Sequence, residues 1–106
     1  MTQLQLTMSD NGKTIDLAPG TRLVLMLMEN PSTGYRWAID PIEPPVVELL
    51  SNEYTLDPGV GFPGGGTRQL DFRVVRSGEV RLSLRLVRQW DPSSIAQRFV
   101  VILRVR

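Results

Sequence analysis

The side chains that could carry chemistry in this chain are hydroxyls, carboxylates and arginines, because its 106 residues include neither histidine nor cysteine. Those absences remove the commonest general base, the commonest metal ligand and the thiolate nucleophile. A serine such as Ser32 has no visible base to activate it, and the carboxylates show no metal-ligand or paired-acid spacing. The glycine-rich segment of residues 59–67 is not followed by Lys-Ser/Thr or by a helix, unlike a phosphate-binding loop. We therefore expect no enzymatic activity and no cofactor.

The most informative stretch is Asn30-Pro31-Ser32-Thr33-Gly34, in which every residue has a reason to form a stiff turn. Pro31 fixes its own φ, Asn30 accepts the extended backbone that precedes proline, and Gly34 permits a positive φ. The hydroxyls of Ser32 and Thr33 can bond to local amides. A hairpin that needed only closure could use a two-residue turn, so the extra length favours a functional loop, with an ordinary inter-strand loop as the alternative.

Two other segments could take part in recognition. The loop from Thr55 to Gly66 contains two prolines and five glycines, and long loops in compact domains are usually functional or mobile. Trp90 follows Arg88 at the entrance of a polar loop, where tryptophan is a poor core residue and a good interface anchor. From the residues alone, packing and interface roles for Trp90 are equally supported. Trp37, in contrast, is expected to pack into the core.

The elements that must position these loops are predicted to be short strands. Alternating apolar residues predict strands over residues 4–8, 14–17, 22–28, 35–40, 70–75, 80–87 and 99–105. The turn at residues 10–13 suggests that the first two strands pair as a hairpin, and the prolines of residues 41–45 indicate a surface crossing. Residues 46–54 also fit a helical face, but their flanking prolines favour an extended segment.

This spacing predicts an all-β fold, an immunoglobulin-like antiparallel β-sandwich of seven or eight strands, with residues 1–106 forming a single domain. In such a sandwich the loops at 30–34, 57–66 and 89–97 can gather at one end. Antibody variable domains present their recognition loops in the same way.

The charge of the chain bears on whether it could bind nucleic acid or an anionic membrane. The net charge is +1, which gives no strong field for nucleic acid or an anionic membrane. Five arginines could line one face, but with few aromatics among them a solvated sheet surface is the better interpretation than a nucleic-acid site; they are Arg73, Arg76, Arg81, Arg85 and Arg88.

The longest apolar run, residues 23–28, is too short to span a bilayer. The N-terminus lacks signal-peptide features, so we expect a cytoplasmic protein, or a periplasmic or secreted one if a signal segment has been removed.

Three motifs follow one another in this chain: NPSTGYRW at residues 30–37, the glycine-rich segment of residues 59–67, and Arg88-Gln89-Trp90. Together they resemble the chagasin family of cysteine protease inhibitors, in the same order and over nearly the full chain. The resemblance implies an immunoglobulin-like monomer that inhibits papain-like (cathepsin L-like) cysteine proteases by reversible, tight binding. An adhesion or assembly module that binds a non-protease partner is the alternative.

The resemblance also implies roles for particular residues. The pentapeptide would be a central wedge in the protease cleft, the glycines would run along the cleft, and the Arg88–Trp90 element would pack on the opposite wall. The implied protease-binding residues are Asn30, Pro31, Ser32, Thr33, Gly34, Phe62, Gly64, Gly65, Gly66, Arg88 and Trp90. The chain departs from the family pattern at Ser32, at Pro63 and at Gln89, and Gln89 should loosen the third loop.

Overall fold

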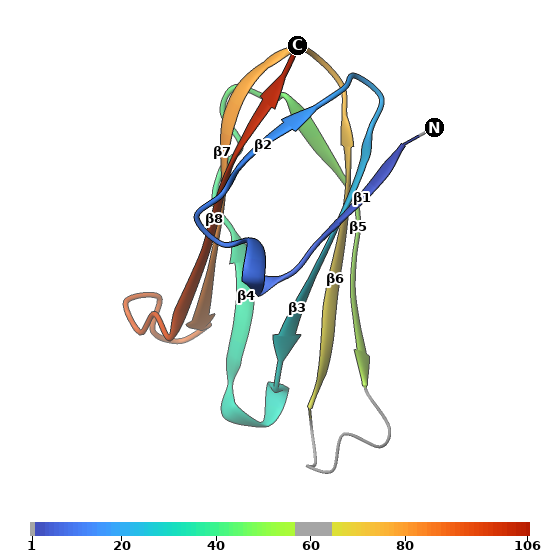
Figure 1. Cartoon of the computed structure of the whole chain (residues 1–106). Coiled ribbons are helices and arrows are strands. Elements are labelled where there is room, and N and C mark those ends of the chain that lie inside the picture. The colour runs from blue at the N-terminus through green and yellow to red at the C-terminus, as the bar shows by residue number, and fades with distance from the viewer. Residues whose placement is uncertain (1, 57–64) are drawn as a thin grey trace.

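The structure is a computed structural model that describes residues 2–56 and 65–106. Two four-stranded sheets face each other, sheet A with the order β1-β3-β6-β5 and sheet B with the order β2-β8-β7-β4 (Figure 1). The strands are β1 (Gln3–Leu6), β2 (Thr14–Leu17), β3 (Arg22–Glu29), β4 (Tyr35–Ile39), β5 (Val47–Leu56), β6 (Gly66–Val74), β7 (Gly78–Arg88) and β8 (Gln97–Val105). Two 3-10 helices are present in the described ranges, η1 (Met8–Asp10) and η2 (Pro31–Thr33). The predicted all-β sandwich is confirmed.

The core lies between the sheets and follows the alternation in the sequence. On β6, Leu70 and Phe72 are fully buried, and on β8 so are Phe99 and Val101. Successive strand residues point to opposite faces, so every second side chain enters the core. Trp37 is also buried, which confirms its predicted place in the core. None of the helices among residues 2–56 and 65–106 is long and apolar enough to cross a membrane.

The predicted hairpin between the first two strands is wrong. β1 pairs in parallel with β3, whereas β2 pairs in parallel with β8 in the other sheet. The turn residues explain the difference: Asn11 Oδ1 accepts a hydrogen bond from Val100 N at 2.8 Å, and Gly12 N donates to Val100 O at 2.7 Å. The turn therefore docks on β8, and η1 carries the chain from one sheet to the other (Figure 1). The sandwich is antiparallel except at these two outer pairings.

The ambiguous segment of residues 46–54 is extended, as predicted, and forms most of β5. Its register with β6 shifts between Leu49 and Ser51. A bulge of this kind adds one residue to a strand, which explains why two consecutive leucines, Leu49 and Leu50, imitated a helical face. Residues 41–45 contain no strand, as expected for a surface crossing.

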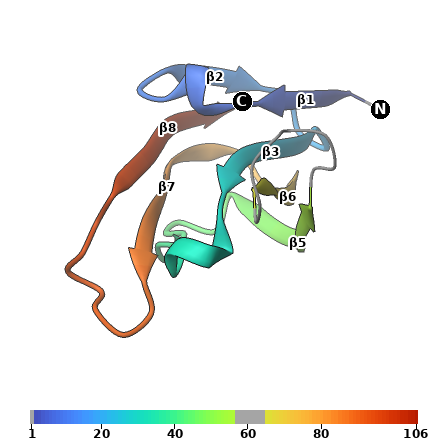
Figure 2. The same cartoon turned by 90° about the horizontal axis from the view of Figure 1, so that it is seen from below.

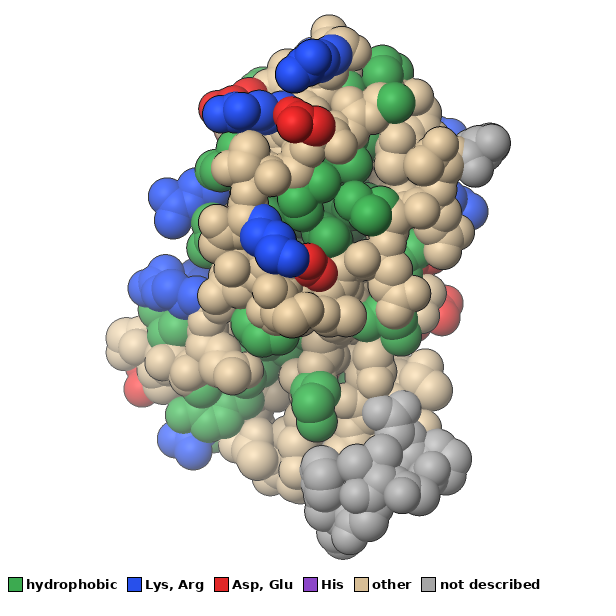
Figure 3. Space-filling model, viewed as in Figure 1, with side chains coloured by type: hydrophobic (Ala, Val, Ile, Leu, Met, Phe, Trp, Pro, Cys, Tyr) green, Lys and Arg blue, Asp and Glu red, His purple; other side chains and the backbone are tan. Residues whose placement is uncertain are grey.

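The arginines do not form the single stripe that the sequence allowed. Arg73 lies on β6 of sheet A, whereas Arg81 and Arg85 lie on β7 of sheet B, so they point from opposite faces of the sandwich. Arg73 forms an ion pair with Glu48, and Arg85 Nε donates to an Asp40 oxygen at 2.8 Å. On the face shown in Figure 3 the basic side chains are dispersed among other types.

Candidate functional site

The described ends of the strands that flank the predicted loops lie at one end of the sandwich, away from both termini (Figures 1 and 2). Strand pairing puts them side by side around residues 30–34. Glu29, before the first loop, pairs with Gly66 at the start of β6. Tyr35, after that loop, pairs with Arg88 at the end of β7. Phe62 and Gly64, predicted in the second loop, lie outside the described residues. Of that predicted loop, Thr55 and Leu56 belong to the end of β5, and Gly65 and Gly66 are buried at the start of β6.

The first loop is held by its own hydrogen bonds. Asn30 Oδ1 accepts from Ser32 N at 3.1 Å and from Ser32 Oγ at 2.7 Å. Thr33 Oγ1 donates to Asn30 O at 2.7 Å and accepts from Tyr35 N at 3.3 Å. These bonds are the local turn chemistry that the sequence predicted, and Pro31, Ser32 and Thr33 are all exposed. The loop is therefore a braced projection whose tip points to solvent.

Trp90 and the end of the first loop form one surface. Gly34 has φ +81°, and a Cβ placed on it would overlap the Trp90 ring at Cη2. The Trp90 ring thus lies against Gly34 while the residue remains 72% exposed. Both the positive φ and the ring contact require glycine at this position. The sequence predicted the first requirement and gave no sign of the second.

Arg88 lies between two aromatic rings. Its guanidinium carbon is 4.5 Å from the centre of the Tyr35 ring and 5.9 Å from that of Trp90, within the range of cation–π attraction. The Nε atom of Arg88 is buried and has no hydrogen-bond partner within the described part of the chain. The Arg88 guanidinium therefore links the Tyr35 and Trp90 rings through cation–π contacts. Tyr35 is a member of this group that the sequence did not single out.

The third loop is also braced internally. Asp91 Oδ1 accepts from Ser93 N at 3.2 Å and from Ser93 Oγ at 2.6 Å. Ser94 Oγ donates to Asp91 O at 2.6 Å. These bonds restrain the residues directly after Trp90, although Gln89 stands where the family pattern has a proline. The loosening expected from Gln89 thus meets a restraint that the sequence alone did not reveal.

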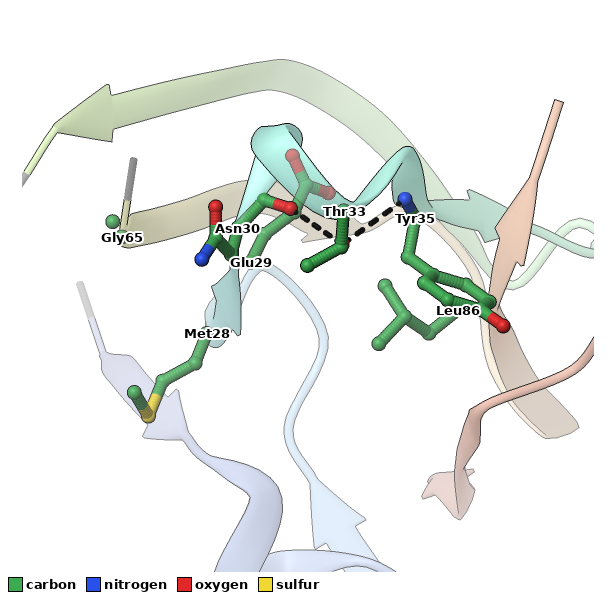
Figure 4. A pocket seen from close by; sticks show the side chains of 8 residues that line it. Met28, Glu29, Asn30, Thr33, Tyr35, Gly65 and Leu86 are labelled. Atoms are coloured by element: carbon green, nitrogen blue, oxygen red, sulfur yellow. Dashed lines mark hydrogen bonds between the residues drawn. The ribbon is translucent and has the colours of Figure 1, made fainter. Parts of the chain in front are cut away.

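A cavity of about 310 Å³ separates the first loop from the start of β6 (Figure 4). Its lining residues are Met28, Glu29, Asn30, Thr33, Tyr35, Gly65, Gly66 and Leu86. Met28 is 70% exposed beside this cavity. The apolar run of residues 22–28 predicted a strand that includes Met28 and did not indicate that its side chain is exposed. Within the described ranges no cluster of three or more aspartate or glutamate residues could hold a metal ion.

Comparison with known sequences gives consistent matches. The family model described as chagasin family peptidase inhibitor I42 matches residues 16–105. Amoebiasin-1 of Entamoeba histolytica is 29% identical over 105 residues, which cover 97% of this chain and 100% of that protein. Chagasin of Trypanosoma cruzi is 29% identical over 105 residues, which cover 94% of this chain and 96% of that protein.

Comparison with solved structures gives the same fold. A cysteine protease inhibitor from Entamoeba histolytica matches with a TM-score of 0.90 at 20% identity, covering 99% of this chain and 96% of that one. An inhibitor solved in complex with falcipain-2 matches with a TM-score of 0.66 at 17% identity, covering 100% of both chains. At these identities the two likenesses establish the sandwich architecture alone.

Proposed function

The chain belongs to the chagasin family of peptidase inhibitors, and from that premise we propose that its three adjacent loops close the active-site cleft of papain-like cysteine proteases. Its role is inhibition, and the family is not one of enzymes. The binding is reversible because no covalent bond is formed. It is tight because internal hydrogen bonds hold the first and third loops in shape before the protease arrives, so less ordering is lost on association.

The first loop is suited to be the wedge. Pro31, Ser32 and Thr33 are exposed at its tip, and the bonds between Asn30, Ser32 and Thr33 resist the deformation that a bound substrate must undergo. A braced 3-10 turn fills a narrow cleft with backbone and side-chain atoms. It offers the protease no extended peptide bond in the geometry that cleavage requires.

The flanking segments supply the grip on each side. On one side the proposed segment is Phe62, Gly64, Gly65 and Gly66. Gly65 and Gly66 are buried, and Gly66 pairs with Glu29 of β3 and Leu56 of β5, so these two glycines hold the base of the segment in sheet A. On the other side, Trp90 offers a large exposed ring, which gives apolar burial with little loss of side-chain freedom. A contact of this kind buries about 1,600 Å² in total.

One observation carries this proposal: the Trp90 ring lies on Gly34, so the wedge and its flanking anchor form one continuous surface. Stoichiometric titration of papain, and of a cathepsin L-like protease, tests it. We expect activity to fall linearly to a one-to-one end point. Full residual activity at micromolar inhibitor, with the chain shown to be folded by circular dichroism, would contradict the proposal.

Replacing Trp90 tests the anchor. Trp90→Ala should weaken inhibition by about 2 kcal/mol or more, as expected for a central interface tryptophan. Its effect on the unfolding free energy should be small, because the side chain is 72% exposed. Inhibition constants and urea denaturation measure the two effects. Val75→Ala is the control, since Val75 is an exposed apolar residue next to the other end of β6, and an inhibition constant for Trp90→Ala equal to that of Val75→Ala would remove Trp90 from the site.

A further inference from the structure

We propose that a buried ion pair between Glu29 and Arg68 is the positioning device of the wedge. The inference rests on the proposed function, because it concerns how the first loop is aimed at a protease. Neither residue is part of the predicted contact surface. Glu29 immediately precedes the first loop, and Arg68 lies near the start of β6. Both residues therefore lie at the end of the sandwich from which the first loop projects.

The carboxylate of Glu29 is fully satisfied without solvent. Its side chain is 0% exposed and that of Arg68 is 17% exposed. Oε2 accepts from Arg68 Nη2 at 2.6 Å, and Oε1 accepts from Arg68 Nε at 3.3 Å, which makes the pair bidentate. Oε1 also accepts from Trp37 N at 2.9 Å. One buried carboxylate thus joins β3 and β6 of sheet A to β4 of sheet B.

This junction does what main-chain pairing cannot do at this point. The two ends of the first loop belong to different sheets, and β4 is an edge strand of sheet B. The Glu29 side chain holds the backbone of Trp37, and in return Trp37 Nε1 donates to Met28 O at 2.9 Å. Each end of the loop therefore holds the other through a side chain. The separation and the direction of the two ends follow from these bonds, and so does the direction of the wedge.

Arg68 is fixed in turn from β5. Its Nη1 donates to Asn52 Oδ1 at 3.2 Å, and its guanidinium carbon is 5.6 Å from the centre of the Tyr54 ring. The Tyr54 ring also lies against Gly66, where a Cβ would overlap it. The same cluster therefore supports the base of the wedge and Gly66, the last glycine of the glycine-rich segment. Two of the three proposed contact loops share one support.

A charged pair suits this role better than an apolar one. Replacing a buried ion pair with packed hydrophobic residues is often neutral for stability, whereas removing one partner leaves an uncompensated charge. The planar fork of arginine adds a fixed geometry that apolar contacts lack. We therefore expect the double variant Glu29→Leu/Arg68→Met to fold and to inhibit poorly.

The experiment compares wild type, Glu29→Gln, Arg68→Lys and the double variant as inhibitors of papain. Glu29→Gln should dissociate at least about tenfold faster, because bonds to a charged partner are the stronger ones, and Arg68→Lys should show an intermediate loss. Glu48→Gln is the matched control: it alters the exposed ion pair with Arg73, which joins β5 to β6 in the same sheet, and its dissociation rate should stay unchanged. Urea denaturation must show each variant folded at the assay temperature, so that lost stability cannot account for lost inhibition.

Amide hydrogen exchange separates this inference from the proposed function. In Glu29→Gln, and more in the double variant, the Trp37 amide and the loop amides of Thr33 and Gly34 should exchange faster without any protease present. If wild type fails to inhibit papain, the proposed function is wrong while exchange still decides the role of the pair. Folded variants with wild-type exchange and wild-type dissociation rates would overturn the inference. Should Glu29→Gln not fold, Arg68→Lys decides in the same two measurements.

Discussion

Gly34 illustrates how much one residue can carry at this site. It ends η2 in the left-handed region, its amide donates to Pro31 O at 3.0 Å, and the Trp90 ring occupies the space where a side chain would begin. A change at Gly34 therefore acts on the wedge and on its anchor together. Gly34 is therefore the residue at which the wedge and its anchor meet in the proposed inhibitory surface.

Replacing Gly34 separates ring displacement from backbone strain. Gly34→Ala should weaken protease inhibition by about 2 kcal/mol or more, since Trp90 must leave its position and anchors of this kind dominate interfaces. Gly12→Ala is the matched control, because Gly12 has φ +86° with nothing near its missing Cβ, whereas Gly34 has φ +81° against Trp90. Both variants should lose about 1 kcal/mol of unfolding free energy. Equal inhibition by the two variants would show that the Trp90 contact is irrelevant to binding.

Among the elements, η2 and its flanking strands decide the shape of the site. Asn30 begins the turn, Gly34 ends it, and the hydroxyl of Thr33 bonds at both sides of it. An exposed turn that satisfies its own polar groups does not need a partner to become ordered. Its stiffness is a local property of these few residues, supported at the base by Glu29 and Trp37.

Two substitutions of Thr33 distinguish bracing from contact. Thr33→Val keeps the shape of the side chain but removes the bonds to Asn30 O and from Tyr35 N, so it should weaken inhibition by about 1–2 kcal/mol, since each of the two bonds contributes about 1 kcal/mol net. Thr33→Ser keeps the hydroxyl and removes one methyl, so it should inhibit nearly as well as wild type. Inhibition constants against papain give both values. If Thr33→Ser proves the weaker inhibitor, methyl contact with the protease matters more than bracing.

Elements of this fold could be predicted from sequence where the information is local. Alternation in residues 70–74 and 99–105 specified strands and core faces, and the turn chemistry of residues 30–34 specified a braced loop. The failures involve distant partners. Asn11 caps Val100 across a separation of 89 residues, and Arg68 meets Glu29 across 39. Nothing in the composition of the first turn distinguishes docking on β8 from closing a hairpin. No local pattern singles out Glu29, because its partner is fixed by sheet topology.

At the scale of the whole molecule, the composition limits how much the charge of the inhibitor changes near neutral pH. The chain has no histidine and no cysteine, the side chains whose charge commonly changes near neutral pH. The chain therefore has no side chain of these types to titrate between about pH 6 and 8. Any pH dependence of inhibition in that range should come from the protease.

This property predicts the pH profile of stability. Thr7 N donates to Asp10 Oδ2 at 2.9 Å, and Lys13 Nζ donates to Asp10 Oδ1 at 3.0 Å. The hydrogen bond from the Thr7 backbone N–H is the larger cause and the bond from Lys13 the next; they hold the pKa of Asp10 below its ordinary value of 3.8. A lowered carboxyl pKa stabilises the fold above the ordinary value, and this contribution is lost as pH falls through the lowered pKa. The unfolding free energy should be flat between about pH 5.5 and 8 and decrease on further acidification.

Asp10→Asn isolates the contribution of that carboxylate. The variant should be less stable than wild type by under about 1 kcal/mol, because the group lies near the surface. The difference should be constant near neutral pH and should shrink below the ordinary pKa of 3.8. Urea denaturation along a pH series measures both. A difference that grows on acidification would contradict the assignment.

The parallel pairing of β2 with β8 has a consequence for biosynthesis. Thr14 is matched with Ile102 and Leu17 with Val105, so β2 finds its neighbour only after residues 102–105 have left the ribosome. Sheet A, whose strands end at Val74, can assemble on the nascent chain while β2 waits beside an incomplete sheet B. Closure of sheet B along β2 therefore waits until Val105 has left the ribosome, and a ribosome stalled before that point would hold a sandwich still open along one edge.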